Sequence, residues 1–298
     1  MEAPQLRPLG VGDIVDRVFA LYRARPLLLI AASAVPYLVF VLVIAVTTLV
    51  LATSIGGIAN VFSALAGGEV PDASLLQNTI FALFGLLFFV IVAAVVVLSV
   101  QTTALVHATA SRYLGKELTL GEAFRLGLRS APRVILAGLA IFLMFILLWV
   151  VLVVLMVISR QGLVVAGIVL LGFIATVYLF ASTLVTPVVA TLENLGPISA
   201  IRRAWSLSTG NRWRILGLQL LLIVINAVLS AIVSTIFVTS LISDTAVRTV
   251  LQQVTNAVVT ILWAPVEWGT FAILYYDLRV RREAFDLQFA AEALPREA

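Results

Sequence analysis

Long apolar segments separated by short polar ones dominate this chain. Each apolar segment exceeds the roughly 20 residues that an α-helix needs to cross the hydrocarbon core of a bilayer. The pattern therefore predicts six membrane-spanning helices and an all-α integral membrane fold. The six segments cover residues 27–55, 80–110, 134–158, 163–192, 215–243 and 251–277.

Composition supports this interpretation and excludes several others. Of the 298 residues, 62% are hydrophobic and 11% are charged, whereas soluble domains are about 25% charged. We therefore expect one membrane domain over residues 1–298. The chain has no cysteine, which excludes disulfides and thiolate chemistry. Its net charge of +4 comes from arginines beside apolar segments, so nucleic acid is not an expected partner.

Basic residues are distributed unevenly between the two sides of the predicted helices. All of the 19 Lys and Arg residues except Arg160 and Arg248 lie in the N-terminal segment, the second loop, the fourth loop or the C-terminal tail. Cytoplasmic loops of membrane proteins carry the excess of positive charge. The distribution therefore predicts that both termini are cytoplasmic.

A threefold repeat is visible in the cytoplasmic segments. Residues 11–26, 118–133 and 196–214 each combine an apolar stripe at helical spacing with arginines, and each leads into an odd-numbered span. The predicted repeat unit is one interfacial amphipathic helix followed by two spans, over approximately residues 1–110, 111–192 and 193–298. These helices are either plain membrane anchors or a surface for partner proteins or lipids. The arginines of the second alternative are Arg17, Arg125, Arg202, Arg203 and Arg212.

Three stretches of the sequence are similar to a known bacterial membrane module. They are LRPLGVGDIVDRVFALYRARP, LENLGPISAIRRAWSLSTGNRWR and YYDLRVRREAFDLQ. Together they resemble the glycerophosphoryl diester phosphodiesterase membrane domain over nearly the whole chain. The residues that make the resemblance fairly specific are Glu193, Gly196, Pro197, Arg203, Trp205, Trp213, Tyr276, Asp277, Arg279 and Glu283.

The resemblance implies a free-standing form of this module in the bacterial plasma membrane. In longer relatives the module is fused to a soluble phosphodiesterase barrel that carries the chemistry, and this sequence shows no such barrel. The single histidine is too little for the acid, base and metal ligands of phosphodiester hydrolysis. We therefore expect no catalytic residue, no metal and no cofactor.

Polar residues within the predicted spans are the remaining candidates for a functional site. Glu267 lies ten residues before Asp277, a depth of about 15 Å at 1.5 Å per residue, near the bilayer midplane. Gln101, Thr183 and Asn226 fall at similar depths in the second, fourth and fifth spans. The four residues therefore predict a polar layer near the middle of the membrane.

Two interpretations of this layer stay open. Its members could be interhelical hydrogen-bonding groups that set the packing of the helices. Alternatively, they could line a water-accessible pocket in which Glu267 titrates and Asn226 and Gln101 orient a solute or proton. The first suits a membrane scaffold that arranges partner proteins or lipids, and the second suits a small-solute transporter. We expect the scaffold, with no enzymatic activity.

Overall fold

The computed structural model of the protein describes residues 7–68, 72–159, 161–238 and 245–288. Within these ranges the regular structure is entirely α-helical and contains no strand, which confirms the predicted fold class. The helices are α1 (Val11–Ala24), α2 (Pro26–Ala66), α3 (Ala73–Tyr113), α4 (Leu120–Ser159), α5 (Gly162–Thr183), α6 (Thr186–Leu192), α7 (Pro197–Ser208), α8 (Arg212–Val238) and α9 (Thr245–Glu283).

Six helical segments are long and apolar enough to cross a membrane, and they match the six predicted spans. The protein is therefore a multi-pass membrane protein. The predicted end of the fifth span, Ser243, lies outside the described residues. The fourth span is made of two helices, because α5 ends at Thr183 and α6 begins at Thr186. Pro187 explains the interruption, since proline has no main-chain N–H to donate to the carbonyl four residues earlier, at Thr183, and its ring crowds that carbonyl.

The second amphipathic segment does not form a separate helix. α4 begins with a capping box, in which the Thr119 amide donates to Glu122 and the Glu122 amide donates to the Thr119 hydroxyl. It then continues through Pro132 to Ser159. The first part of this long helix packs closely on α3. A Cβ atom on Gly127 would lie only 3.0 Å from the main-chain nitrogen of Ala104.

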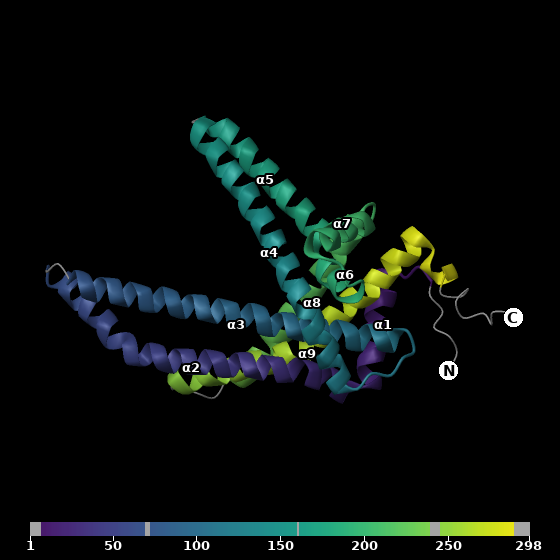
Figure 1. The fold of residues 1–298 in the computed structure, drawn as a ribbon, viewed down its shortest axis with the longest axis horizontal. Coiled ribbons are helices and arrows are strands. Elements are labelled where there is room, and N and C mark those ends of the chain that lie inside the picture. The colour runs from purple at the N-terminus through teal and green to yellow at the C-terminus, as the bar shows by residue number, and fades with distance from the viewer. Residues whose placement is uncertain (1–6, 69–71, 160, 239–244, 289–298) are drawn as a thin grey trace.

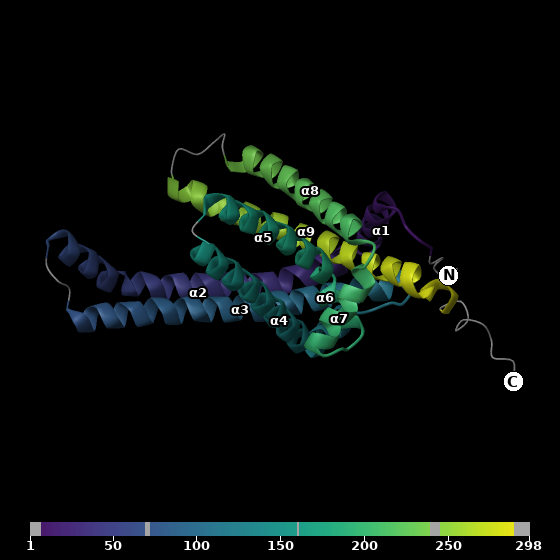
Figure 2. The ribbon, with the colours of Figure 1, turned by 90° about the horizontal axis from the view of Figure 1, so that it is seen from above.

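The spans form three helical hairpins that share one base. The α2–α3 and α4–α5 hairpins diverge from this base, where α1, α6 and α7 also lie (Figure 1). The third hairpin pairs α8 with α9 (Figure 2). Helix α9 is central, because it packs on α1, α2 and α3 as well as on α8. In its most apolar stretch 61% of residues are buried, against at most 22% in the other spans. Those other spans therefore present apolar surfaces suited to lipid.

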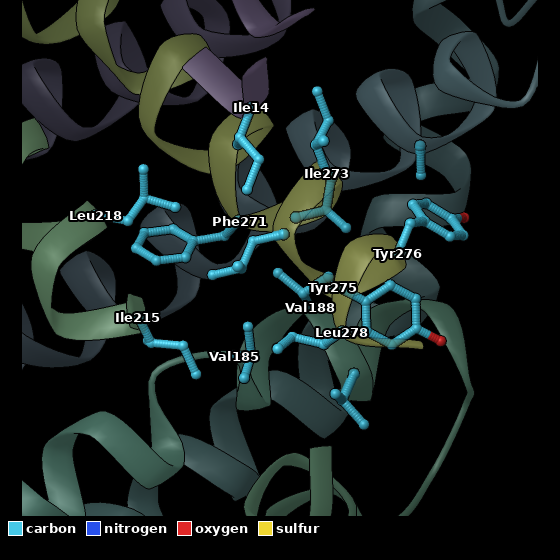
Figure 3. Close-up of a cluster of buried hydrophobic side chains, with 14 of the residues drawn as sticks. Ile14, Val185, Val188, Ile215, Leu218, Phe271, Ile273, Tyr275, Tyr276 and Leu278 are labelled. Atoms are coloured by element: carbon cyan, nitrogen blue, oxygen red, sulfur yellow. The ribbon is translucent and has the colours of Figure 1, made fainter. Parts of the chain in front are cut away.

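The largest core cluster lies at the base of the hairpins. Side chains of α1, α8 and α9 converge there with Val185 and Val188 (Figure 3). Ile14 and Val18 of α1 and Leu207 of α7 belong to the same cluster. The apolar stripes of the first and third amphipathic segments therefore pack against protein, whereas the sequence pattern suggested the membrane interface.

Candidate functional site

Asp277 lies at the centre of the first ionic cluster at the base. Its side chain is fully buried near the end of α9. Arg214, from the start of α8, pairs with its Oδ2 atom, and Nε of Arg281 donates to the same oxygen at 3.0 Å. Both arginines also donate to the main-chain oxygen of Leu9. The cluster therefore joins the N-terminal segment to the last two spans.

Arg203 lies at the centre of a second ionic cluster. Its Nε atom is 3.0 and 2.9 Å from the two carboxylate oxygens of Glu193. Its two terminal nitrogens donate to the two carboxylate oxygens of Glu283. Nε of Arg279 also donates to Glu283, at 3.1 Å, and the Tyr275 hydroxyl donates to Glu193 at 2.8 Å. The α6–α7 connection, α7 and the end of α9 are joined in this way.

The carboxylates around Arg203 keep its guanidinium group charged. Hydrogen bonds to Glu283, and then to Glu193, raise the pKa of its guanidinium above the usual value. Arg203 therefore stays charged throughout the physiological pH range, and all three of its donor nitrogens point at carboxylates. Arg203 was predicted to contact a partner, but in the structure its ion pairs with Glu193 and Glu283 hold helices together.

The other predicted contact arginines fall into two groups. Arg17 donates to the Tyr113 hydroxyl at 3.1 Å, and Arg212 donates to the Ser182 hydroxyl at 2.7 Å. Arg125 and Arg202 are exposed, and no hydrogen bond or ion pair within 4 Å is found for either among the described residues. Two of the five predicted arginines are therefore fully available at the surface.

The predicted polar layer is only partly assembled. Nε2 of Gln101 donates to the Ser33 hydroxyl at 2.8 Å and to the Ser33 main-chain oxygen at 3.1 Å, and so links α3 to α2. The Thr183 hydroxyl donates to the main-chain oxygen of Leu179 in its own helix, at 2.9 Å. These two residues therefore act as local structural groups and do not join Glu267.

Glu267 and Asn226 do share a pocket between α8 and α9. The pocket has a volume of about 250 Å³ and is also lined by Gln219 and Trp263. The Asn226 side chain accepts a hydrogen bond from Ser230. No partner of the buried Oε1 atom of Gln219 is found among the residues that the structure describes. No hydrogen bond or ion pair of Glu267 is found in the described part of the chain. This pocket, in which three polar side chains meet a mostly apolar wall, is the candidate ligand site within the membrane.

Gln219 and Ser33 take part in these contacts although neither was among the predicted site residues. The helical spacing of Gln219 with Asn226 places both on one face of α8, so a polar stripe indicated Gln219. Nothing in the sequence pairs Ser33 with Gln101. Within the described ranges, no group of three or more His, Cys, Asp or Glu residues is placed to hold a metal ion.

Comparisons with protein-family models, curated proteins and solved structures find no match for this chain.

Proposed function

We propose that the protein is a non-enzymatic scaffold of the bacterial plasma membrane, which arranges partner proteins or lipids at the cytoplasmic end of its helices. The proposal includes kinship with the glycerophosphoryl diester phosphodiesterase membrane domain. One observation carries it: exposed arginines, for which no hydrogen bond or ion pair is found among the described residues, project from a base that two ionic clusters hold together. A rigid, charged surface favours recognition, because little conformational entropy is lost on binding.

The exposed arginines belong to two neighbouring elements. Arg125 and Arg129 are exposed on the first turns of α4, and Arg202 is exposed on α7. The two helices pack against each other, and Arg133 of α4 donates to Asn194, close to the start of α7. Their positive charges therefore lie at one end of the molecule, where they suit an acidic partner surface.

Co-purification tests this proposal. The tagged protein is isolated from native membranes in mild detergent, and stoichiometric companions are identified by mass spectrometry. We expect the triple variant Arg125→Gln, Arg129→Gln, Arg202→Gln to lose a companion that the wild type retains. Arg248→Gln is the matched control, because Arg248 is also exposed but lies near the opposite end of α9. A companion held equally by all three proteins contradicts a role for the arginine surface.

The pocket at Glu267 favours a second candidate, a small-solute or proton transporter. A carboxyl group deep in a span is costly unless it serves a pathway or finds a partner, and Glu267 has a pocket beside it. Reaction with carbodiimides tests access to this carboxyl. If it faces a water-filled path, a water-soluble reagent should label Glu267 in intact membranes, and Glu267→Gln should abolish the label. Labelling by a membrane-soluble reagent alone contradicts water access.

A further inference from the structure

A groove separate from the Glu267 pocket lies between α5 and α8. Trp213 and Leu216 line it from α8. It has a volume of about 550 Å³, within the roughly 300–1,000 Å³ typical of small-molecule sites. Phe173, Val177 and Tyr178 line it from α5. Both helices are membrane spans, so the apolar part of the groove faces the acyl chains of the bilayer.

Arg212 lies at one end of this groove and is held in a defined position. The centre of its guanidinium group is 4.3 Å from the ring centre of Tyr178 and 5.3 Å from that of Trp205. Its Nε atom donates to the fully buried Ser182 at 2.7 Å. No hydrogen-bond partner of its two terminal nitrogens is found in the part of the chain that the structure describes. Both terminal nitrogens of this side chain, which lines the groove, are therefore available as donors.

The electrostatic environment at this end is positive. Helix α8 begins at Arg212, so the positive end of the α8 dipole lies at the Arg212 end of the groove. A Cβ atom on Gly210, which also lines the groove, would lie 3.8 Å from a terminal nitrogen of Arg282. No Asp or Glu is among the described residues that line the groove. An anionic group is therefore the complementary ligand.

We propose that this groove binds an anionic phospholipid. The phosphate accepts hydrogen bonds from the terminal nitrogens of Arg212, a geometry that guanidinium groups favour. One acyl chain packs along Phe173, Val177 and Leu216. Trp213 is 84% exposed and sits beside the headgroup, where indole rings are common in membrane proteins. Net positive charge from Arg212 and Arg282 disfavours the cationic choline of a zwitterionic lipid.

This inference deepens the lipid-binding half of the proposed scaffold role and rests on it. The two nonetheless depend on different residues, because the co-purification test concerns Arg125, Arg129 and Arg202. Loss of lipid binding with retention of a protein companion would remove only the present inference. Loss of the companion with retention of the lipid would remove only the arginine surface.

Lipid retention by the full-length protein tests the proposal. The protein is purified in nonionic detergent, mixed with equal amounts of phosphatidylglycerol and phosphatidylcholine, and examined by native mass spectrometry. We expect the wild type to retain one phosphatidylglycerol in preference to phosphatidylcholine. Arg212→Gln should weaken that retention roughly tenfold, because charged hydrogen bonds are lost. Arg248→Gln, which changes an exposed arginine in the first turn of α9 and away from the groove, should behave as wild type.

A second variant keeps the test decisive if Arg212→Gln does not fold. Leu216→Trp fills the apolar part of the groove and leaves every contact of Arg212 in place, so it should reduce retention of both lipids. Equal retention of the two lipids by the wild type would overturn the proposal. Unchanged phosphatidylglycerol retention in folded Arg212→Gln, or in Leu216→Trp, would also overturn it.

Discussion

The main-chain amide of Leu9 donates a 2.7 Å hydrogen bond to Oδ1 of Asp277, although the two residues are 268 positions apart. Arg214 and Arg281 bind the other carboxylate oxygen and also the Leu9 main-chain oxygen. The beginning of the described chain is thus attached to its last helix. This contact ties the N-terminal segment to the hairpin that α8 and α9 form.

Replacing Asp277 by Asn should destabilise the protein strongly. The substitution leaves two partly buried guanidinium groups without a neutralising charge, which typically costs about 3–5 kcal/mol. Thermal unfolding in detergent, followed by circular dichroism, measures the loss. Asp16→Asn is the control, because Asp16 is exposed and its replacement should change stability by less than about 0.5 kcal/mol. Equal melting temperatures for the two variants would contradict the role assigned to Asp277.

The neighbouring residues Arg202 and Arg203 should respond very differently to lysine. Arg203 binds two carboxylates at once through three nitrogens, a geometry that a single ammonium group does not reproduce. We expect Arg203→Lys to cost on the order of 2 kcal/mol. Arg202→Lys keeps the charge at an exposed site and should be nearly neutral. Chemical denaturation of both variants measures the difference, and a similar midpoint for both would disprove it.

Gly127 should tolerate no large side chain. A Cβ atom there would lie 3.0 Å from the Ala104 nitrogen and 3.2 Å from its Cα atom, both in α3. Gly127→Leu must push α3 and α4 apart, at a cost of roughly 1–3 kcal/mol. A Cβ atom on the exposed Gly138 of the same helix would meet nothing within 4 Å, so Gly138→Leu serves as the control. Expression level and melting temperature report the result; a stable Gly127→Leu protein would show that the helices pack less closely.

Gln101 should contribute to the pairing of α2 with α3. Gln101→Leu removes two hydrogen bonds to Ser33, and interhelical hydrogen bonds in membranes contribute roughly 1 kcal/mol. Thr183→Val is a suitable comparison, because among the described residues the Thr183 hydroxyl bonds only to main-chain oxygens of its own helix. Unfolding in a series of detergent mixtures compares the two. A larger loss in Thr183→Val than in Gln101→Leu would reverse the assignment.

The chain has no cysteine, so single introduced cysteines report topology directly. The charge distribution predicts that Arg125→Cys lies in the cytoplasm and Arg248→Cys lies outside. A membrane-impermeant maleimide should label Arg248→Cys in intact cells and should label Arg125→Cys only after permeabilisation. The opposite pattern would place the termini outside.

Parts of the candidate sites were predictable from local patterns. Glu267 and Asn226 were identified because polar side chains are costly in lipid, and they do share a pocket. Arg125 and Arg202 were identified by charge beside an apolar stripe, and they are exposed. Gln101 is a polar residue at a similar depth to Asn226, but it bonds to Ser33 and does not line the pocket. Depth in the membrane indicates how far along a span a residue lies, but not which neighbouring span it faces.

The long apolar segments are enough to predict the helical class and the six spans, because a bilayer requires long apolar helices with satisfied main-chain groups. The central position of α9 and the pairing of Arg203 with Glu193 and Glu283 became visible only in the folded arrangement of the helices. The same arrangement places Arg212 at the end of a groove between α5 and α8. Hydrophobicity acts on each segment separately, whereas ion pairs and grooves depend on contacts between residues far apart in the chain.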